Sequence, residues 1–328
     1  MSTGKTILLF GMPRSGTTWI GKIFDSHDGT LYRHEPDTRK KIYQIPMLEE
    51  QTDAGKYCEF VNQYLANFVN DRDVSVNGKL PLFPKQYSSY IQYEAFYLST
   101  MLAGVASKLS KKINLPVLHP VNLVKTDDYV VVWKSIQLLG RMGIIADCID
   151  NCRAIHILRH PCGYIASVQA GERMKKFVSH TAASEDWNLY SQLMKTSQAL
   201  RYDLTLEKME KMSPEERLAW RWVIFNEKAS DDTQNNPYVM KLRYEDMCSF
   251  PVETAKACFE FCELDWCDQT ESFLGVSTRK TSDSYYSVYK DPMIAANKWQ
   301  STLSDDQISA ILKVVKSTRI GSYYFDTD

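Results

Sequence analysis

The chain has 328 residues, 44% of them hydrophobic and 24% charged, which suits one large α/β domain over residues 1–328. The formal net charge of −1 gives no reason to expect a nucleic acid or another polyanion as a partner. Residues 1–5 show no signal peptide and no apolar stretch approaches the ~20 residues of a membrane span, so we expect a cytoplasmic protein.

The eight cysteines are scattered along the chain, and none has the C-x-x-C spacing of a zinc site. Cys58 stands alone, and Cys148 and Cys152 are only loosely clustered. This usage predicts reduced, mostly buried thiols in a cytosolic protein and no bound metal. The sequence gives no indication of the oligomeric state.

The first readable elements are a strand, a turn and a helix. Residues 7–10 form a short apolar run, typical of a strand buried on both faces. Gly11 and Pro13 end this run, residues 15–18 are small, and apolar residues recur at helical spacing from Trp19. Because the first N–H groups of a helix have no internal partner and the helix dipole favours an anion there, we expect this turn to bind phosphate.

The turn differs from the loop that binds nucleoside triphosphates, which reads G-x-x-x-x-G-K-[ST]. Gly11 and Gly16 keep the spacing, but Thr17 and Thr18 follow and the Lys is missing. A cation comes earlier, at Arg14, so the loop suits one phosphate-sized group with a guanidinium across it. An ATP-dependent kinase is one alternative. Another is an ordinary turn capped by Ser and Thr, although four small residues in a row exceed what capping needs.

A carboxylate follows the second predicted strand, residues 30–33. Pro36 cannot continue a strand, so Glu35 is expected at the strand end, where the carboxyl ends of a parallel sheet line the ligand crevice. Its neighbour His34 is the rival for the same role. Since successive side chains of a strand point to opposite faces, we expect Glu35 to face the crevice and His34 to be a packing residue. A solvated surface carboxylate is the plain alternative.

Two long segments are harder to interpret. Residues 38–125 are rich in Tyr and contain helical patterns at about 58–69 and 93–109. Residues 171–234 also have a helical, amphipathic pattern. We expect both segments to be helical insertions that cover the ligand crevice.

The middle of the chain alternates strands with helices. Residues 129–135, 154–158 and 239–242 are the predicted strands, the first strongly β-branched. The order predicts an α/β fold, P-loop-like, with a central mostly parallel sheet and helices on both faces. Lys134 lies at one strand end, and Arg159 directly follows another. Further helical patterns are at about 136–148, after Pro161 with Ile165, Val168 and Met174 inward, at 252–262 and at 305–316.

Four stretches together resemble one family. Residues 13–19 (PRSGTTW) look like the 5′-phosphosulfate loop of sulfotransferases that use 3′-phosphoadenosine 5′-phosphosulfate (PAPS). Arg159 and Ser167 match the family pattern R-[DNH]-P-x(5)-S, which binds the 3′-phosphate, and a guanidinium with a hydroxyl suits that anion. Residues 243–246 (RYED) and 297–299 (NKW) are similar to family segments near the adenine and the 3′-phosphate.

The resemblance implies roles for individual residues. Arg14 and Lys134 would offset the charge that builds on the sulfuryl group, and Glu35 would accept the acceptor's proton. Trp19 would stack on the adenine. The residues expected to bind the nucleotide are Arg14, Ser15, Gly16, Thr17, Thr18, Trp19, Arg159, Ser167, Tyr244 and Lys298.

The sequence departs from the soluble small-molecule branch, which has K-T-H after this strand. Here the run is Lys134-Ser135-Ile136, and an isoleucine cannot take a proton. Arg14, where many soluble members carry Lys, looks more like the protein-tyrosine and carbohydrate branches and their bacterial relatives. Glu35 follows Arg14 by 21 residues, as the catalytic Glu does in the protein-tyrosine branch. The departure favours Glu35 as the base.

We therefore predict a sulfotransferase that moves a sulfuryl group in line from PAPS to a hydroxyl or amine of a small-molecule or carbohydrate acceptor, releasing 3′,5′-bisphosphoadenosine (PAP) without a metal. A nucleotide-binding module that has lost catalysis is the non-enzymatic alternative. The sequence does not name the acceptor.

Overall fold

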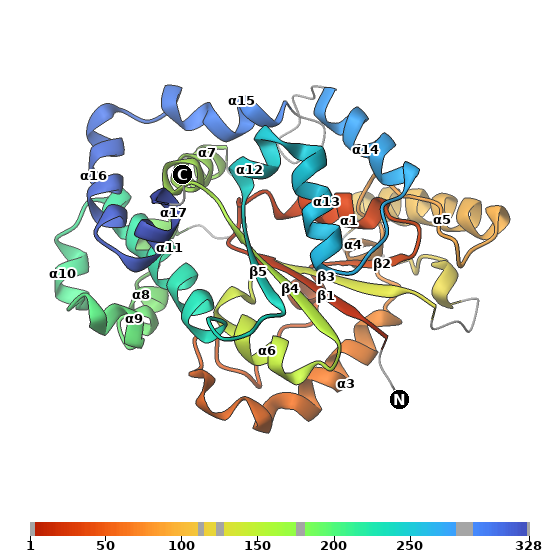
Figure 1. The fold of residues 1–328 in the computed structure, drawn as a ribbon, viewed down its shortest axis with the longest axis horizontal. Coiled ribbons are helices and arrows are strands. Elements are labelled where there is room, and N and C mark those ends of the chain that lie inside the picture. The colour runs from red at the N-terminus through yellow and green to blue at the C-terminus, as the bar shows by residue number, and fades with distance from the viewer. Residues whose placement is uncertain (1–3, 111–114, 123–127, 175–180, 280–290, 327–328) are drawn as a thin grey trace.

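A computed structural model describes residues 4–110, 115–122, 128–174, 181–279 and 291–326, and its centre is a sheet of five strands (Figure 1). In chain order the strands are β1 (Thr6–Gly11), β2 (Thr30–His34), β3 (Val130–Ser135), β4 (Cys152–Leu158) and β5 (Val239–Arg243). Their spatial order is β2-β3-β1-β4-β5, and every pairing is parallel. The predicted α/β fold is confirmed.

The strand order places the phosphate loop at the centre of the sheet. β1 lies between β3 and β4. The strands β2 and β3 lie on one side of β1, and β4 and β5 lie on the other. In parallel sheets, ligands bind beyond the carboxyl ends of the strands where the order reverses. The loop after β1 therefore occupies that point, with the ends of β3 and β4 on either side.

Alternate residues of the strands enter two separate cores. Leu8 and Phe10 face one side of the sheet, and Ile7 and Leu9 face the other, all fully buried. The first side is covered chiefly by α3 (Cys58–Val69), α6 (Met142–Cys148), α7 (Pro161–Arg173), α11 (Pro214–Asp232), α16 (Asp305–Lys316) and α17 (Arg319–Phe325). The second is covered by α1 (Thr17–Ser26), α12 (Tyr244–Ser249), α13 (Pro251–Phe261) and α14 (Asp268–Arg279).

The remaining helices are short or peripheral. They are α2 (Pro36–Arg39), α4 (Val74–Asn77), α5 (Tyr90–Leu109), α8 (Trp187–Leu193), α9 (Ser197–Arg201), α10 (Leu206–Glu210) and α15 (Pro292–Asn297). Five 3-10 turns are η1 (Gln51–Tyr57), η2 (Pro120–Asn122), η3 (Leu139–Arg141), η4 (Ala183–Glu185) and η5 (Lys298–Ser301). In the described parts of the chain, no helix combines the length and apolar character needed to cross a membrane.

Helix boundaries match the sequence prediction in some places and not in others. Those of α3 and α16 agree with it. The helix expected from residue 136 begins only at Met142, because Ser135 Oγ accepts hydrogen bonds from the amides of residues 137 and 138 and forms a turn. Met174 was expected inward but is 56% exposed, because it lies just past the end of α7.

The two predicted insertions contain helices joined by non-helical stretches such as 78–89, while 111–114, 123–127 and 175–180 lie outside the described residues. α11 begins with a capping box between Ser213 and Glu216 and then runs through the core. Its Trp222 is fully buried and donates a hydrogen bond from Nε1 to the carbonyl oxygen of Arg159, at 3.0 Å. α11 thus supports the end of β4. For the other residues of 171–234, a role in covering the acceptor stays a prediction.

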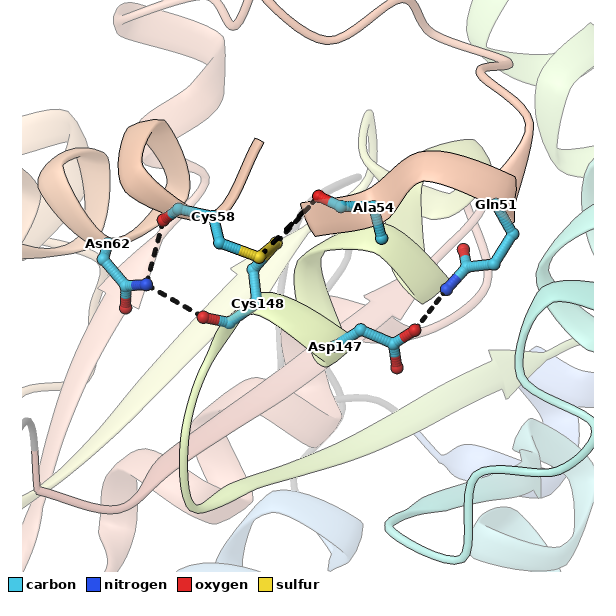
Figure 2. Close-up of a disulfide and its surroundings, with 6 residues drawn as sticks. All are labelled: Gln51, Ala54, Cys58, Asn62, Asp147 and Cys148. Carbon is cyan, nitrogen blue, oxygen red and sulfur yellow. Dashed lines mark hydrogen bonds between the residues drawn. A yellow bond between two sulfur atoms is a disulfide. The ribbon is translucent and has the colours of Figure 1, made fainter. Parts of the chain in front are cut away.

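The expectation of reduced cysteines is wrong for one pair. Cys58 and Cys148 form a disulfide between the start of α3 and the end of α6, across 90 residues of sequence (Figure 2). Asn62 Nδ2 donates hydrogen bonds to the carbonyl oxygens of both cysteines, each at 2.9 Å. Sequence spacing gave no sign of the pair, because packing of two distant helices brings the sulfurs together. The other six cysteines are free.

We expect thiol counting to find this disulfide. Without reductant, the denatured protein should expose six reactive thiols, and eight after reduction. Replacing both Cys58 and Cys148 by Ser should lower the free energy of unfolding by about 4–5 kcal/mol, because the cross-link restricts the unfolded chain over a long loop. Cys267→Ser, which removes a free thiol, is the matched control and should change stability little. Eight reactive thiols without reductant would contradict the pairing.

Candidate active site

The loop between β1 and α1 is shaped by its backbone. Arg14 and Gly16 both have positive φ angles, 72° and 80°, which turn the chain sharply after the strand. A Cβ at Gly16 would lie 2.2 Å from the ring of Tyr244, so only glycine fits beneath that ring. Ser15 and Thr17 are almost fully buried on either side of Gly16. The loop therefore presents the first N–H groups of α1 at the carboxyl end of β1, as an anion site requires.

Two arginines meet on the β4 side of this loop. Arg14 Nε donates a hydrogen bond to Ser167 Oγ at 3.0 Å. Arg159 Nη1 donates to the carbonyl oxygen of Arg14 at 2.6 Å, and its guanidinium lies over the ring of Tyr244. Within the described residues, the buried Arg159 Nε has no hydrogen-bond partner. Two guanidinium groups and the hydroxyl of Ser167, in the middle of α7, form a site suited to an anion.

A second group of side chains lies on the β3 side. Glu35 Oε1 is hydrogen-bonded and ion-paired to Lys134 Nζ, which is almost fully buried at the end of β3. The amide of Glu35 also donates to the carbonyl oxygen of Lys134, at 2.9 Å. Glu35 itself keeps 18% of its side chain exposed. A carboxylate and an ammonium are thus held together, with the carboxylate open to solvent.

The expectation that His34 and Glu35 point to opposite faces is wrong. β2 ends at His34, and Glu35 takes a left-handed backbone conformation with φ 48°. That turn brings His34 Nε2 to 3.7 Å from Glu35 Oε1. On its other side, His34 Nδ1 is hydrogen-bonded to the hydroxyl of Tyr32 at 2.8 Å. The imidazole therefore lies beside the carboxylate and links it to Tyr32.

Burial sets the charge states here. Burial, with the positive charges of Lys134 and Lys79, holds the pKa of His34 well below its ordinary value, so this imidazole is neutral at neutral pH. Burial also lowers the pKa of Lys134, and the attraction of Glu35 opposes that shift. The group can therefore offer a half-buried carboxylate to accept a proton and an ammonium to meet negative charge.

Sequence reasoning missed two residues of this group. Asp37 is buried and accepts hydrogen bonds from Ser135 Oγ at 2.8 Å and Trp133 Nε1 at 3.3 Å. An acid two residues after Glu35 was the available signal. The positive charge of Lys79, from the first predicted insertion, contributes to the lowered pKa of His34. Burial lowers the pKa of Lys79 itself, and the negative charge of Glu35 opposes that shift. Nothing in the pattern around Lys79 marks it, because its insertion has no motif.

Asp37 should make stability depend on pH. Burial raises its pKa from 3.8 to about 6 in the folded protein. The folded state therefore keeps a proton that the unfolded chain releases, so this contribution to stability is complete below about pH 4 and is lost as pH rises through about 6. As pH rises from 4 to above 6, the free energy of unfolding of the wild type should fall by about 3 kcal/mol more than that of Asp37→Asn.

Denaturant unfolding of both proteins at pH 4, 5, 6 and 7 measures this difference. Asp150→Asn, at an exposed position, is the matched control and should run parallel to the wild type. A constant difference between wild type and Asp37→Asn at all four pH values would contradict the raised pKa.

Other expected nucleotide residues lie around the same loop. Trp19 is buried, its Nε1 donates to Ser277 Oγ at 3.1 Å, and its ring meets the edge of Tyr244. Stacking of Trp19 on adenine stays a prediction. Lys298 is exposed on η5, and the next residue, Trp299, stacks on His160 at the start of α7 with ring centres 4.5 Å apart. This stacking places η5 beside the helix that carries Ser167.

The expectation of no metal-ligand cluster needs a qualification. His27, Asp28 and Cys267 have possible ligand atoms within 4.8 Å of one another. His27 and Asp28 follow the end of α1, and Cys267 precedes α14, whereas the phosphate loop precedes the start of α1. This group is therefore separate from the candidate active site.

The family follows from comparison with known proteins. A model described as the sulfotransferase family matches residues 6–268, a range that holds the loop, Glu35, Lys134, Arg159 and Ser167. The chain belongs to the sulfotransferase family. A comparison with curated protein sequences found no match.

Solved structures of sulfotransferases are also similar over almost the whole chain. One is the sulfotransferase domain of the Synechococcus PCC 7002 olefin synthase, with 15% identity, 94% of this chain and 93% of that chain covered, and a TM-score of 0.42. Another is mouse sulfotransferase SULT7A1 complexed with PAP, with 12% identity, coverage of 99% and 89%, and a TM-score of 0.45. Sulfotransferase STF9 from Mycobacterium avium has 12% identity, coverage of 97% and 77%, and a TM-score of 0.41.

Proposed function

We propose that the protein transfers a sulfuryl group from PAPS to a hydroxyl or amine of a small-molecule or carbohydrate acceptor. The observation that carries the proposal is the pairing of Glu35 with Lys134 beside a phosphate loop. β2, β3 and β1 are neighbours in a parallel sheet, so the ends that carry these residues and the loop lie at one edge. A base, a cation and an anion site at one edge are what sulfuryl transfer needs.

Each group has one task in the proposed reaction. The loop and the start of α1 bind the 5′-phosphate of PAPS. Glu35 accepts the proton of the acceptor as the new bond to sulfur forms and the bond between sulfur and the phosphate oxygen breaks. Arg14 and Lys134 offset the charge that builds on the sulfuryl oxygens and on the departing phosphate. PAP then leaves, and the chemistry requires no covalent enzyme intermediate.

Arg159 and Ser167 are proposed to bind the 3′-phosphate. The unpartnered Nε of Arg159 supports this role, because a buried N–H without an acceptor is costly until a ligand supplies one. Ser167 Oγ accepts a hydrogen bond from Arg14 Nε, which places this hydroxyl beside the loop that carries Arg14.

Two other functions remain as alternatives. A kinase would use ATP and Mg²⁺, and the missing Lys after Gly16 argues against it. A nucleotide-binding module without catalysis would need no carboxylate at the site. Glu35 paired with Lys134 argues against that module, since such a pair is retained at a cost in desolvation.

We expect PAP to bind far more tightly than 5′-AMP. The two ligands differ in the 3′-phosphate, and each charge-assisted hydrogen bond to it contributes on the order of 1.5–3 kcal/mol. Isothermal titration calorimetry measures both affinities. Arg159→Ala should reduce the preference for PAP over 5′-AMP, whereas Arg153→Ala, on the strand that Arg159 follows but outside the site, should leave the preference unchanged. Equal affinities for PAP and 5′-AMP in the wild type would overturn the 3′-phosphate assignment.

A further inference from the structure

α5 is attached to the rest of the protein by one face only. Its start is fixed by a capping box between Ser89 and Gln92. Along its 20 residues, only Phe96, Thr100 and Ala103 are buried. Phe96 and Ala103 belong to a small separate core. The helix, about 30 Å long, lies at the edge of the molecule beyond β2 (Figure 1).

The opposite face of α5 carries an exposed apolar stripe. Its members recur at alternating intervals of four and three residues, and they are Ile91, Ala95, Leu98, Leu102, Val105 and Leu109. The side chains at 91 and 109, at the two ends, are 79% and 80% exposed, and those between them at 98, 102 and 105 are 58–65% exposed. Spacing of this kind forms the seam between two packed helices. Soluble monomers seldom leave such a continuous stripe uncovered.

We propose that this stripe, the α5 seam, pairs with the α5 seam of a second copy of the chain, with the two helices antiparallel. A twofold axis at the level of Thr100 makes the seam complementary to itself. Leu98 then faces Leu102 of the second copy, and the outer layers place Ile91 against Leu109 and the small Ala95 against Val105. Every apolar position meets another, as a symmetric interface requires.

The charges beside the seam favour the antiparallel arrangement. Glu94 and Lys108 flank the seam on the same side, each one position before an apolar residue of the repeat. Antiparallel pairing about Thr100 brings Glu94 next to Lys108 of the second copy, and symmetry makes this ion pair twice. Parallel pairing in register would instead bring Glu94 beside Ser99. Charges at these flanking positions set the orientation of paired helices.

The available surface also suits a dimer. Stable interfaces bury about 800 Å² on each partner, so a dimer needs more surface than the seam of one helix alone. Tyr90 and Tyr97, 75% and 40% exposed, extend the apolar surface on the side of Glu94 and Lys108. Aromatic side chains are enriched in such interfaces. One basic and one acidic residue beside the seam give no excess of positive charge for an anionic membrane surface.

Sedimentation velocity on the full chain tests the proposal. The wild type should sediment as a dimer at micromolar concentration. Leu98→Glu with Leu102→Glu should raise the dimer dissociation constant at least 100-fold, while the circular dichroism spectrum of the folded protein stays unchanged because both positions are exposed. Tyr43→Glu, at a position 79% exposed on another part of the surface, is the matched control and should leave the dimer intact.

Charge reversal tests the orientation. Glu94→Lys and Lys108→Glu should each weaken the dimer about tenfold, and the two changes together should restore it. Met101→Cys, close to the axis, should cross-link two copies under mild oxidation, whereas Ile91→Cys should not. The proposal would be overturned if the wild type were monomeric at 100 µM. This includes the case in which the monomer binds vesicles of neutral and anionic phospholipid. A dimer that persists when Leu98 and Leu102 are both changed to Glu would also overturn it. The same holds for a dimer that cross-links through Ile91→Cys but not through Met101→Cys.

Discussion

Glu35→Gln is expected to lower turnover by roughly 10²–10⁴-fold, because the amide keeps the shape of the side chain but cannot accept a proton. The affinity for PAP should stay within a few-fold of the wild type, since the loop after β1 and the arginines near Ser167 do not depend on this carboxylate. Turnover with saturating PAPS and a hydroxyl acceptor, measured beside PAP binding by calorimetry, separates the two effects.

His34→Ala is the matched control for the base. His34 lies 3.7 Å from Glu35 and is neutral, so its loss should have a milder effect on turnover than loss of the carboxylate. Full turnover by Glu35→Gln together with an inactive His34→Ala would reverse the two roles. If neither change impairs turnover, the acceptor needs no base, and the proposed role of Glu35 is wrong.

The second large effect is expected from the two cations. Lys134→Met and Arg14→Ala should each reduce turnover by about 10²–10³-fold, because their main partner is charge that develops in the transition state. Binding of PAP should change much less.

Arg14→Lys is the conservative control for the loop cation. A lysine retains the charge without the planar guanidinium, so turnover should recover substantially compared with Arg14→Ala. Near wild-type turnover by Arg14→Ala or Lys134→Met at saturating PAPS would show that the residue does not stabilise the transition state.

Much of this site could be predicted because of one property of parallel sheets. Arg14, Lys134 and Arg159 each follow or end a strand with a clear apolar pattern, and the carboxyl ends of parallel strands share an edge. Local patterns therefore predicted a long-range arrangement. The functional loop was also recognisable from the spacing of Gly11 and Gly16, and the structure gives each glycine a reason: a Cβ at Gly11 would lie 2.7 Å from the carbonyl oxygen of Ile157, and Gly16 has a positive φ.

Other features depend on contacts that no local pattern encodes. Glu35 is expected at the strand end because Pro36 cannot continue a strand, yet Glu35 adopts the left-handed region and its side chain pairs with Lys134. Asp37 is buried only because Trp133 and Ser135 of a neighbouring strand donate to it. The disulfide likewise depends on the packing of α3 against α6. In each case tertiary contacts override the local preference.

The most direct test of the central claim is transfer of labelled sulfate. The protein is incubated with PAPS carrying ³⁵S and a panel of phenols, sugars and amines, and both the labelled product and released PAP are measured, with Glu35→Gln as the matched control. We expect at least one acceptor to become labelled, with one PAP released for each product and little of either from the variant. Phosphoryl transfer from ATP with Mg²⁺ and no labelled product from PAPS would contradict the proposed function.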